Sequence, residues 1–131
     1  MYLFDSNIFL EILLGQSSAH QARDVLEKMT EKQRGCVTSF SLHAIEAIIG
    51  AKQSRLGILA DFLSFVISHP FLDPYYTTSE EELEVAKLAK RLKLDFDDAL
   101  QYFVAKKEKY TLVTFDRDFL KVKGIKVLFP G

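Results

Sequence analysis

Short apolar runs alternate along this chain with longer segments whose apolar residues recur every three or four positions. The short runs, which are typical of buried strands, are Tyr2–Phe4, Gly35–Thr38, Thr111–Thr114 and Lys126–Leu128. The longer segments predict helices, and the clearest stripe consists of Phe96, Ala99, Leu100, Phe103 and Val104. Strands separated by helices are typical of parallel βα units. The pattern therefore predicts a three-layer α/β/α sandwich with a central, mainly parallel sheet.

Polar residues and glycines indicate where these helices begin and end. The predicted helices run from Ser6 or Asn7 to about Gly15, from about His20 to Glu31, from Ser39 or Ser41 to Ala51, from Leu56 to Ile67, from Ser79 to about Leu92, and onward from Asp95. Ser79 and Glu82 match a capping box, and Pro70–Pro74 is expected to be irregular or extended. No linker divides the chain, so residues 1–131 are expected to form one domain.

Composition narrows the class of protein. The chain has 131 residues, of which 48% are hydrophobic and 27% charged, with a net charge of −1, and these values exclude a disordered chain. Cys36 is the only cysteine, which excludes a disulfide framework and a thiolate-rich zinc site. No apolar run reaches the roughly 20 residues that cross a bilayer, and no signal peptide is recognised, so we expect a cytoplasmic protein.

Two aspartates follow predicted strands. Asp5 comes directly after the first strand, and Asp116 lies two residues after Thr114. Ligand sites of open α/β sheets form outside the carboxyl ends of the strands, so these acids are expected to converge on one edge. The alternative is that Asp5 and Asp116 only cap short helices that begin there.

Glu46 is a third candidate, because it borders an apolar helical stripe that includes Ile45 and Ile49. A carboxylate beside a buried stripe must be paired, neutralised or bound to a metal. His43, one turn away, could pair with it, as could a lysine.

Acids also gather at the start of the clearest helix and after the strand that follows it. Asp95, Asp97 and Asp98 are favoured there by the helix dipole, but they also repel one another. A divalent cation would relieve that repulsion, and carboxylates suit Mg²⁺ or Mn²⁺ better than zinc. Asp116 and Asp118 could join the same pocket. Periodicity leaves open whether Asp97 or Asp98 faces it, and no phosphate-binding loop or nucleophile elbow is present.

Charge is distributed unevenly between the two parts of the chain. Residues 1–86 contain 6 basic and 12 acidic residues, a net of −6, whereas residues 87–131 contain 11 basic and 6 acidic residues, a net of +5. Basic residues around an acidic pocket suit a polyanion such as nucleic acid. The alternative is that these lysines only solvate helix faces.

Four segments together resemble the PIN domain. They are Leu3–Asn7, Glu46 on a following helix, Asp97–Leu100 and Val113–Phe119, in the family's order and at about its spacing. The resemblance covers essentially the whole chain and is closest to the VapC-like ribonuclease toxins of prokaryotic toxin–antitoxin pairs. It implies a Mg²⁺- or Mn²⁺-dependent endoribonuclease site, with one or two ions, at the ends of parallel strands.

The resemblance also implies roles for individual residues. The catalytic acids and metal ligands would be Asp5, Glu46, Asp98 and Asp116, with Asp118 as a further ligand and Asn7, Thr114 and Asp97 in support. The implied partners are an RNA substrate, a small antitoxin protein and a second copy of the chain.

Other functions are compatible with parts of this pattern. A PIN-like RNA-processing nuclease or a catalytically inactive binding scaffold would share the fold, although a scaffold is expected to lose some of the acids. A phosphoacceptor signalling domain also gathers aspartates and Mg²⁺ at strand ends. That class requires a pair of acids after the first strand and a lysine after a late one, whereas here Asp5 stands alone and Phe115 follows Thr114.

Overall fold

The sheet of the protein contains five strands, all parallel. The computed structural model describes residues 1–131. Its strands are β1 (Tyr2–Phe4), β2 (Gly35–Thr38), β3 (Leu72–Tyr75), β4 (Thr111–Val113) and β5 (Lys126–Leu128), in the spatial order β3-β2-β1-β4-β5. From β1 the chain builds toward β3 and then returns to the other side of β1 with β4. The topological switch point, where open α/β sheets bind ligands, therefore lies between β1 and β4.

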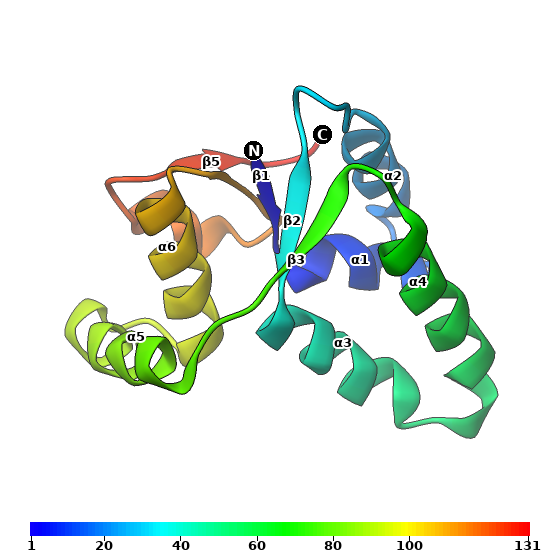
Figure 1. Ribbon diagram of the computed structural model, residues 1–131, viewed down its shortest axis with the longest axis horizontal. Coiled ribbons are helices and arrows are strands. Elements are labelled where there is room, and N and C mark those ends of the chain that lie inside the picture. The colour runs from blue at the N-terminus through cyan, green and yellow to red at the C-terminus, as the bar shows by residue number, and fades with distance from the viewer.

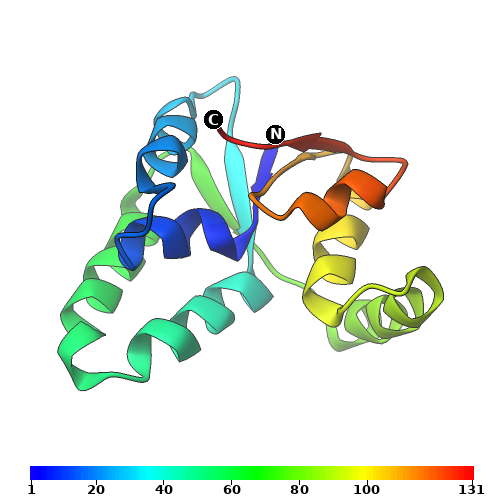
Figure 2. The same cartoon turned by 180° about the vertical axis from the view of Figure 1, so that it is seen from behind.

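Helices cover both faces of the sheet. They are α1 (Ser6–Leu13), α2 (Ala19–Glu27), α3 (Ser39–Gly50), α4 (Leu56–Ser68), α5 (Ser79–Leu92) and α6 (Phe96–Glu108), with short 3₁₀ helices η1 (Gln53–Arg55) and η2 (Arg117–Lys121). Helices α1 to α4 lie on one side of the sheet, and α5 and α6 on the other (Figures 1 and 2). The predicted three-layer α/β/α sandwich is confirmed. None of these helices combines the length and the apolar character that crossing a membrane requires.

Two of the three buried hydrophobic clusters cover opposite faces of the sheet, and the third lies between α5 and α6. Side chains at successive strand positions point to opposite faces, so residues in register share a cluster. Phe4, Val37 and Val113 contribute to the larger cluster with side chains of α1 to α4, whereas Leu3, Cys36 and Leu112 join side chains of α6 and η2. The ends of β1 and β4 are thereby fixed from both sides, and they carry the polar residues described below.

The caps of two helices precede the residues predicted as caps. The sequence suggested Ser6 or Asn7 as the cap of the first helix, but Asp5 occupies that position, without a side-chain cap hydrogen bond. At the start of α3 the cap is Thr38 rather than either predicted serine, and its hydroxyl accepts a hydrogen bond from the Ser41 amide at 3.0 Å. In both cases the cap is the last extended residue before the helix, since a cap residue keeps a non-helical backbone.

The predicted capping box is also shifted by one residue. Thr78 and Glu81 form it, rather than Ser79 and Glu82. The Glu81 amide donates to the Thr78 hydroxyl at 3.1 Å, and the Thr78 amide donates to the Glu81 carboxylate at 2.9 Å. Thr78 is extended, with φ −85° and ψ 163°, so it satisfies the backbone requirement of a cap.

Two further boundaries differ from the predictions. Helix α2 ends at Glu27 rather than Glu31, because residues 30–33 form a turn in which the Gln33 amide donates to the Thr30 hydroxyl at 3.0 Å. The segment predicted as irregular or extended forms β3 at the edge of the sheet. Pro74, which has no N–H, is tolerated there because an edge strand pairs on one side only.

Candidate active site

The topological switch point brings together the residues that follow β1 and β4. Asp5 ends β1, and its amide donates to the carbonyl of Val113 at 3.0 Å, which continues the pairing of the two strands. The Asp5 side chain is only 3% exposed. Thr114 and Asp116 follow β4 on the same edge, so the expected convergence of the two strand ends is confirmed.

A hydrogen-bond network surrounds the buried Asp5 carboxylate. The Thr114 hydroxyl donates to Asp5 Oδ2 at 2.7 Å and accepts from the Asp116 amide at 3.0 Å. Asn7 Nδ2 lies 3.2 Å from both Asp5 Oδ2 and Thr114 Oγ1, and Asn7 Oδ1 accepts from the Phe115 amide at 3.3 Å. Asn7 and Thr114 therefore hold Asp5 and the segment after β4 in one arrangement.

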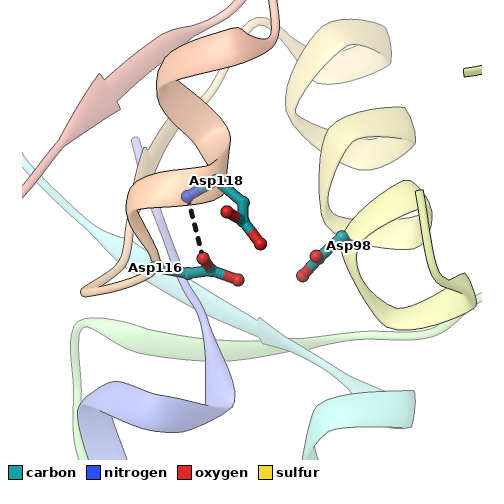
Figure 3. Close-up of side chains that lie close together, drawn as sticks. All are labelled: Asp98, Asp116 and Asp118. Atoms are coloured by element: carbon teal, nitrogen blue, oxygen red, sulfur yellow. Dashed lines mark hydrogen bonds between the residues drawn. The ribbon is translucent and has the colours of Figure 1, made fainter. Parts of the chain in front are cut away.

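Three further carboxylates converge beside this network. Oxygen atoms of Asp98, Asp116 and Asp118 all lie within 4.8 Å of one another. Asp98 projects from the start of α6 toward the two aspartates that follow β4 (Figure 3). Asp116 also caps η2 by accepting from the Asp118 amide at 2.9 Å, as the capping alternative expected. Asp95 caps α6 by accepting from the Asp98 amide at 2.9 Å, so the Asp98 carboxylate is not needed as a cap.

The environment of these acids disfavours their negative charge. Burial raises the pKa of Asp5 to about 6, although the hydrogen bond from Thr114 opposes the shift. The pKa of Asp98 is raised to about 7, first by burial and then by the charges of Asp95 and Asp116. Acids that repel one another in a partly buried site are stabilised by a bound cation. The shifts therefore mark this cluster as a candidate functional site.

The donor set suits a hard divalent cation. Every candidate ligand in the cluster is a carboxylate oxygen, which Mg²⁺ and Mn²⁺ prefer, and no thiolate or imidazole that would favour zinc belongs to it. The three clustered aspartates, with Asp5 beside them, could hold such an ion.

Two of the candidate residues lie differently. Asp97 is half-buried, its Oδ1 atom has no hydrogen-bond partner, and its pKa is raised chiefly by burial. Glu46 is half-buried on α3 and is not one of the three clustered aspartates. It forms neither a hydrogen bond nor an ion pair, so the suggested pairing with His43 is absent. The structure thus gathers the aspartates and leaves Glu46 outside the cluster.

A buried polar contact between α3 and α6 was not predicted from the sequence. Gln101 Nε2 donates to Ser41 Oγ at 2.7 Å, and both residues are fully buried. A glutamine between the apolar Leu100 and Val104 was the available signal, because a polar residue on a buried stripe needs a partner. This contact ties the helix of Glu46 to the helix of Asp98.

A cleft of about 630 Å³ opens beside the clustered aspartates. Its lining includes Asp98 and Asp118 together with Lys93, Lys121 and Lys123. Lys121 Nζ lies 3.9 Å from Asp118 Oδ1, at a largely exposed position. We call this hollow the carboxylate cleft, and its lining combines possible cation ligands with positive side chains.

Comparison with known proteins identifies a family model and several similar structures. The model of the PIN domain matches residues 2–125. A chain of VapBC2 from Rickettsia felis, solved bound to a DNA fragment from its promoter, superposes with a TM-score of 0.78 at 15% identity, over 99% of this chain and 98% of that one.

Two other solved structures are similar over almost their whole length. A toxin–antitoxin complex from Klebsiella pneumoniae gives a TM-score of 0.71 at 20% identity, covering 100% of this chain and 98% of the other. VapC20 from Mycobacterium tuberculosis, a toxin that cleaves the sarcin–ricin loop, gives 0.78 at 13% identity, covering 97% and 98%. No curated protein matches the sequence.

Proposed function

Because this chain belongs to the PIN-domain family, we propose that it is a divalent-metal-dependent endoribonuclease and the toxin of a toxin–antitoxin pair. The observation that carries the proposal is the convergence of Asp98, Asp116 and Asp118 within 4.8 Å beside the buried Asp5. PIN domains are nucleases, and similar structures include a toxin that cleaves the sarcin–ricin loop of RNA. A phosphoacceptor domain has no support from the family match.

Each acid has a proposed role at the site. Asp5, Asp98 and Asp116 would hold Mg²⁺ or Mn²⁺ with Asp118, and Glu46 would complete the ligand set from α3. The bound ion would lower the pKa of water and stabilise charge on the departing oxygen of the phosphodiester. Asn7 and Thr114 would orient the Asp5 carboxylate, as their hydrogen bonds to it do here. One of these acids would accept the proton of the attacking water.

The carboxylate cleft also offers contacts for the phosphates of the substrate. Lys93, Lys121 and Lys123 lie along its walls. Lysine contacts to phosphates position a strand without reading its sequence. We propose that choice of the cleavage sequence depends on bases that are not paired, as is usual for RNA.

Two protein partners are proposed with this function. An antitoxin would cover the carboxylate cleft and place a basic side chain among the acids. A second copy of the chain would cover the exposed apolar residues of α4, where Ile58 is 41% and Ile67 is 86% exposed. A cytoplasmic location is part of the same proposal.

The experiment that tests the function is cleavage of a panel of labelled RNAs by the purified protein. Wild type and Asp98→Asn are compared in Mg²⁺, Mn²⁺ and EDTA, with Asp61→Asn, an exposed acid of α4, as the matched control. We expect metal-dependent cleavage that falls about 100-fold or more in Asp98→Asn and is unchanged in Asp61→Asn.

Other outcomes would contradict the proposal in different ways. Equal cleavage by wild type and Asp98→Asn would indicate a contaminating nuclease or a different active site. A folded wild type that neither cleaves RNA nor binds Mn²⁺ would favour the inactive scaffold. Cleavage that persists in EDTA would contradict the requirement for a metal.

A further inference from the structure

Two more clefts follow the carboxylate cleft along α6, each sharing lining residues with the one before it. The second, of about 390 Å³, lies between α5 and α6 and shares Leu92 and Tyr102 with the carboxylate cleft. The third, of about 620 Å³, lies between the end of α6 and the start of β4 and β5, and shares Lys106 with the second. Since neighbouring clefts share lining residues, they follow one another from the aspartates to the opposite edge of the sheet. From Asp98 to Lys109 the helix rises by about 16 Å.

Charge changes along this series of clefts. The carboxylate cleft contains both signs of charge, but the charged side chains of the other two are all basic: Arg91, Lys106 and Lys107 in the second, and Lys106, Lys109 and Lys126 in the third. Lys107 forms an ion pair with Glu81 at 2.8 Å, whereas the others form none. Apart from Lys107, the basic side chains of the second and third clefts are therefore not paired with an acidic side chain of the protein.

Aromatic side chains accompany these basic residues. Tyr102 and Phe103 line the second cleft, and Tyr110 lines the third. Lys106 Nζ lies 3.4 Å from the Tyr102 hydroxyl and 5.6 Å from the centre of its ring. Tyr102 is only 7% exposed, so the rings that a base can reach are those of Phe103 and Tyr110, which are partly exposed. A positively charged groove with accessible aromatic side chains is the arrangement by which proteins bind single-stranded nucleic acid.

Backbone conformation at two lysines adds to this pattern. Lys93 and Lys109 are the non-glycine residues with positive φ, at 57° and 60°, and each follows the end of a helix. Glycine is the residue that this position favours. Here a lysine occupies this position at the end of both helices, and its positive charge interacts favourably with the helix dipole. Lys93 thereby lines the carboxylate cleft and Lys109 the third cleft.

We propose that the second and third clefts form a path that binds single-stranded RNA on one side of the cleavage point. This inference rests on the proposed ribonuclease function and extends it. The strand passes from the aspartates over Lys106 to Lys109 and Lys126, and its phosphates are held by these lysines. A substrate that is long enough to follow α6 therefore binds more tightly than one that fills the carboxylate cleft alone.

The test compares two triple variants of equal charge. Lys106, Lys109 and Lys126 are changed to Gln in the path variant, and Lys28, Lys32 and Lys52, exposed residues outside the path, are changed to Gln in the control variant. Binding of a labelled single-stranded RNA of 20 nucleotides and mixed sequence is measured in EDTA at several salt concentrations. Each lost phosphate contact lowers the slope of log K against log salt by about 0.7, so we expect a decrease of about 2 and roughly 100-fold weaker binding at 0.1 M salt in the path variant. The control variant should bind as wild type.

Cleavage distinguishes a failure of the path from a failure of the proposed function. In Mg²⁺, the path variant should cleave a four-nucleotide substrate at the wild-type rate and lose kcat/KM only on the 20-nucleotide RNA. If it binds and cleaves the long RNA as wild type does, or if the control variant loses as much affinity, the path is wrong and the ribonuclease function stands. If the wild type neither binds nor cleaves RNA, both proposals are wrong.

Discussion

Two hollows of this protein differ in how they are built. The carboxylate cleft lies between the start of α6 and η2, the short helix that follows β4 beyond the switch point of the sheet. On the other side of the sheet, a groove of about 410 Å³ lies between α1, α2 and α4, and most of its lining is apolar. We call it the apolar groove; its lining includes Phe9, Ile12, Leu13, Leu26, Ile58, Phe62 and Phe65. Charged side chains line most of the carboxylate cleft, whereas apolar side chains line most of the apolar groove.

The difference shows what places a reactive site in such a fold. Helix α4 is apolar around most of its circumference, yet only Phe62 and Val66 are buried, so a groove remains wherever its other side chains meet α1 and α2. The aspartates beside the carboxylate cleft instead follow from topology, because the strand order reverses between β1 and β4 and the carboxyl ends of these parallel strands share one edge. An apolar hollow can result from incomplete packing alone. Acids that converge at a switch point repel one another, so their convergence indicates a function such as binding a cation.

The largest effect on stability is expected in the apolar groove. Phe62 is 5% exposed, and its ring centre lies 5.3 Å from that of Phe9. Phe62→Ala should lower the free energy of unfolding by about 3–5 kcal/mol, measured by urea unfolding, because it removes a buried aromatic ring and leaves a cavity. Mn²⁺ affinity of the folded variant should not change.

A matched variant in the same helix provides the control. Phe65 is 37% exposed, and Phe65→Ala should cost clearly less than Phe62→Ala. A large loss of Mn²⁺ affinity in folded Phe62→Ala would contradict the view that the two hollows are independent.

A smaller effect is expected in the hydrogen-bond network around Asp5, beside the clustered aspartates. Thr114→Val keeps the shape of the side chain but removes the hydroxyl that donates to Asp5 at 2.7 Å. We expect a loss of about 1–3 kcal/mol in the free energy of unfolding at pH 7.5, because the buried Asp5 carboxylate loses its shortest hydrogen bond and keeps the longer one from Asn7. Thr111→Val is the control, since the Thr111 side chain forms no hydrogen bond and should cost little.

The pH dependence of the stability lost in Thr114→Val tests whether Thr114 acts through the charge of Asp5. The hydroxyl lowers the pKa of Asp5, which burial raises to about 6, so its removal raises that pKa further. At pH 5 Asp5 is largely protonated in both proteins, and the loss caused by Thr114→Val should be smaller than at pH 7.5. An equal loss at both pH values would mean that Thr114 acts by packing and not through the charge of Asp5.

The sequence predicted the fold and most of the aspartate cluster for an identifiable reason. Apolar periodicity and strand–helix alternation decide the layers, and the ends of parallel strands necessarily share an edge. Asp5 and Asp116 could therefore be paired before any coordinates were known. Capping residues were misplaced by one position, because neighbouring Ser and Thr residues compete for a cap and only the backbone decides between them.

Other features required the three-dimensional structure. Periodicity left Asp97 and Asp98 open, and the resemblance to the PIN domain favoured Asp98; the structure shows how an Asp98 oxygen lies near Asp116 and Asp118 while Asp97 is not in the cluster. The contact between Ser41 and Gln101 spans 60 residues of chain, and no local pattern encodes such a pair. The linked clefts along α6 also combine α5, α6 and β5, which the sequence separates.

The smallest expected effect on stability is a gain. Asp98 has a pKa of about 7 in the folded protein and an ordinary value of 3.8, so the folded state holds more protons than the unfolded state between about pH 4 and pH 7. The stability of the wild type therefore falls as pH rises through this range. Asp98→Asn cannot ionise, so in EDTA at pH 7.5 it should be about 1–2 kcal/mol more stable than wild type, after allowance for screening at a partly exposed site. At pH 4 the two proteins should be equal.

Urea unfolding in EDTA at pH 4, 5.5 and 7.5 measures this gain, and Asp61→Asn at the rim of the apolar groove is the control that should show none. Saturating Mn²⁺ should reverse the order at pH 7.5, because a ligand that binds only the folded state adds about 2.7 kcal/mol at 100 times its Kd. If Asp98→Asn is instead less stable than wild type in EDTA at pH 7.5, the Asp98 carboxylate already has a favourable partner within the protein. In that case its charge would not require a cation, and the contrast between repelling charges in the carboxylate cleft and uncharged packing in the apolar groove would fail.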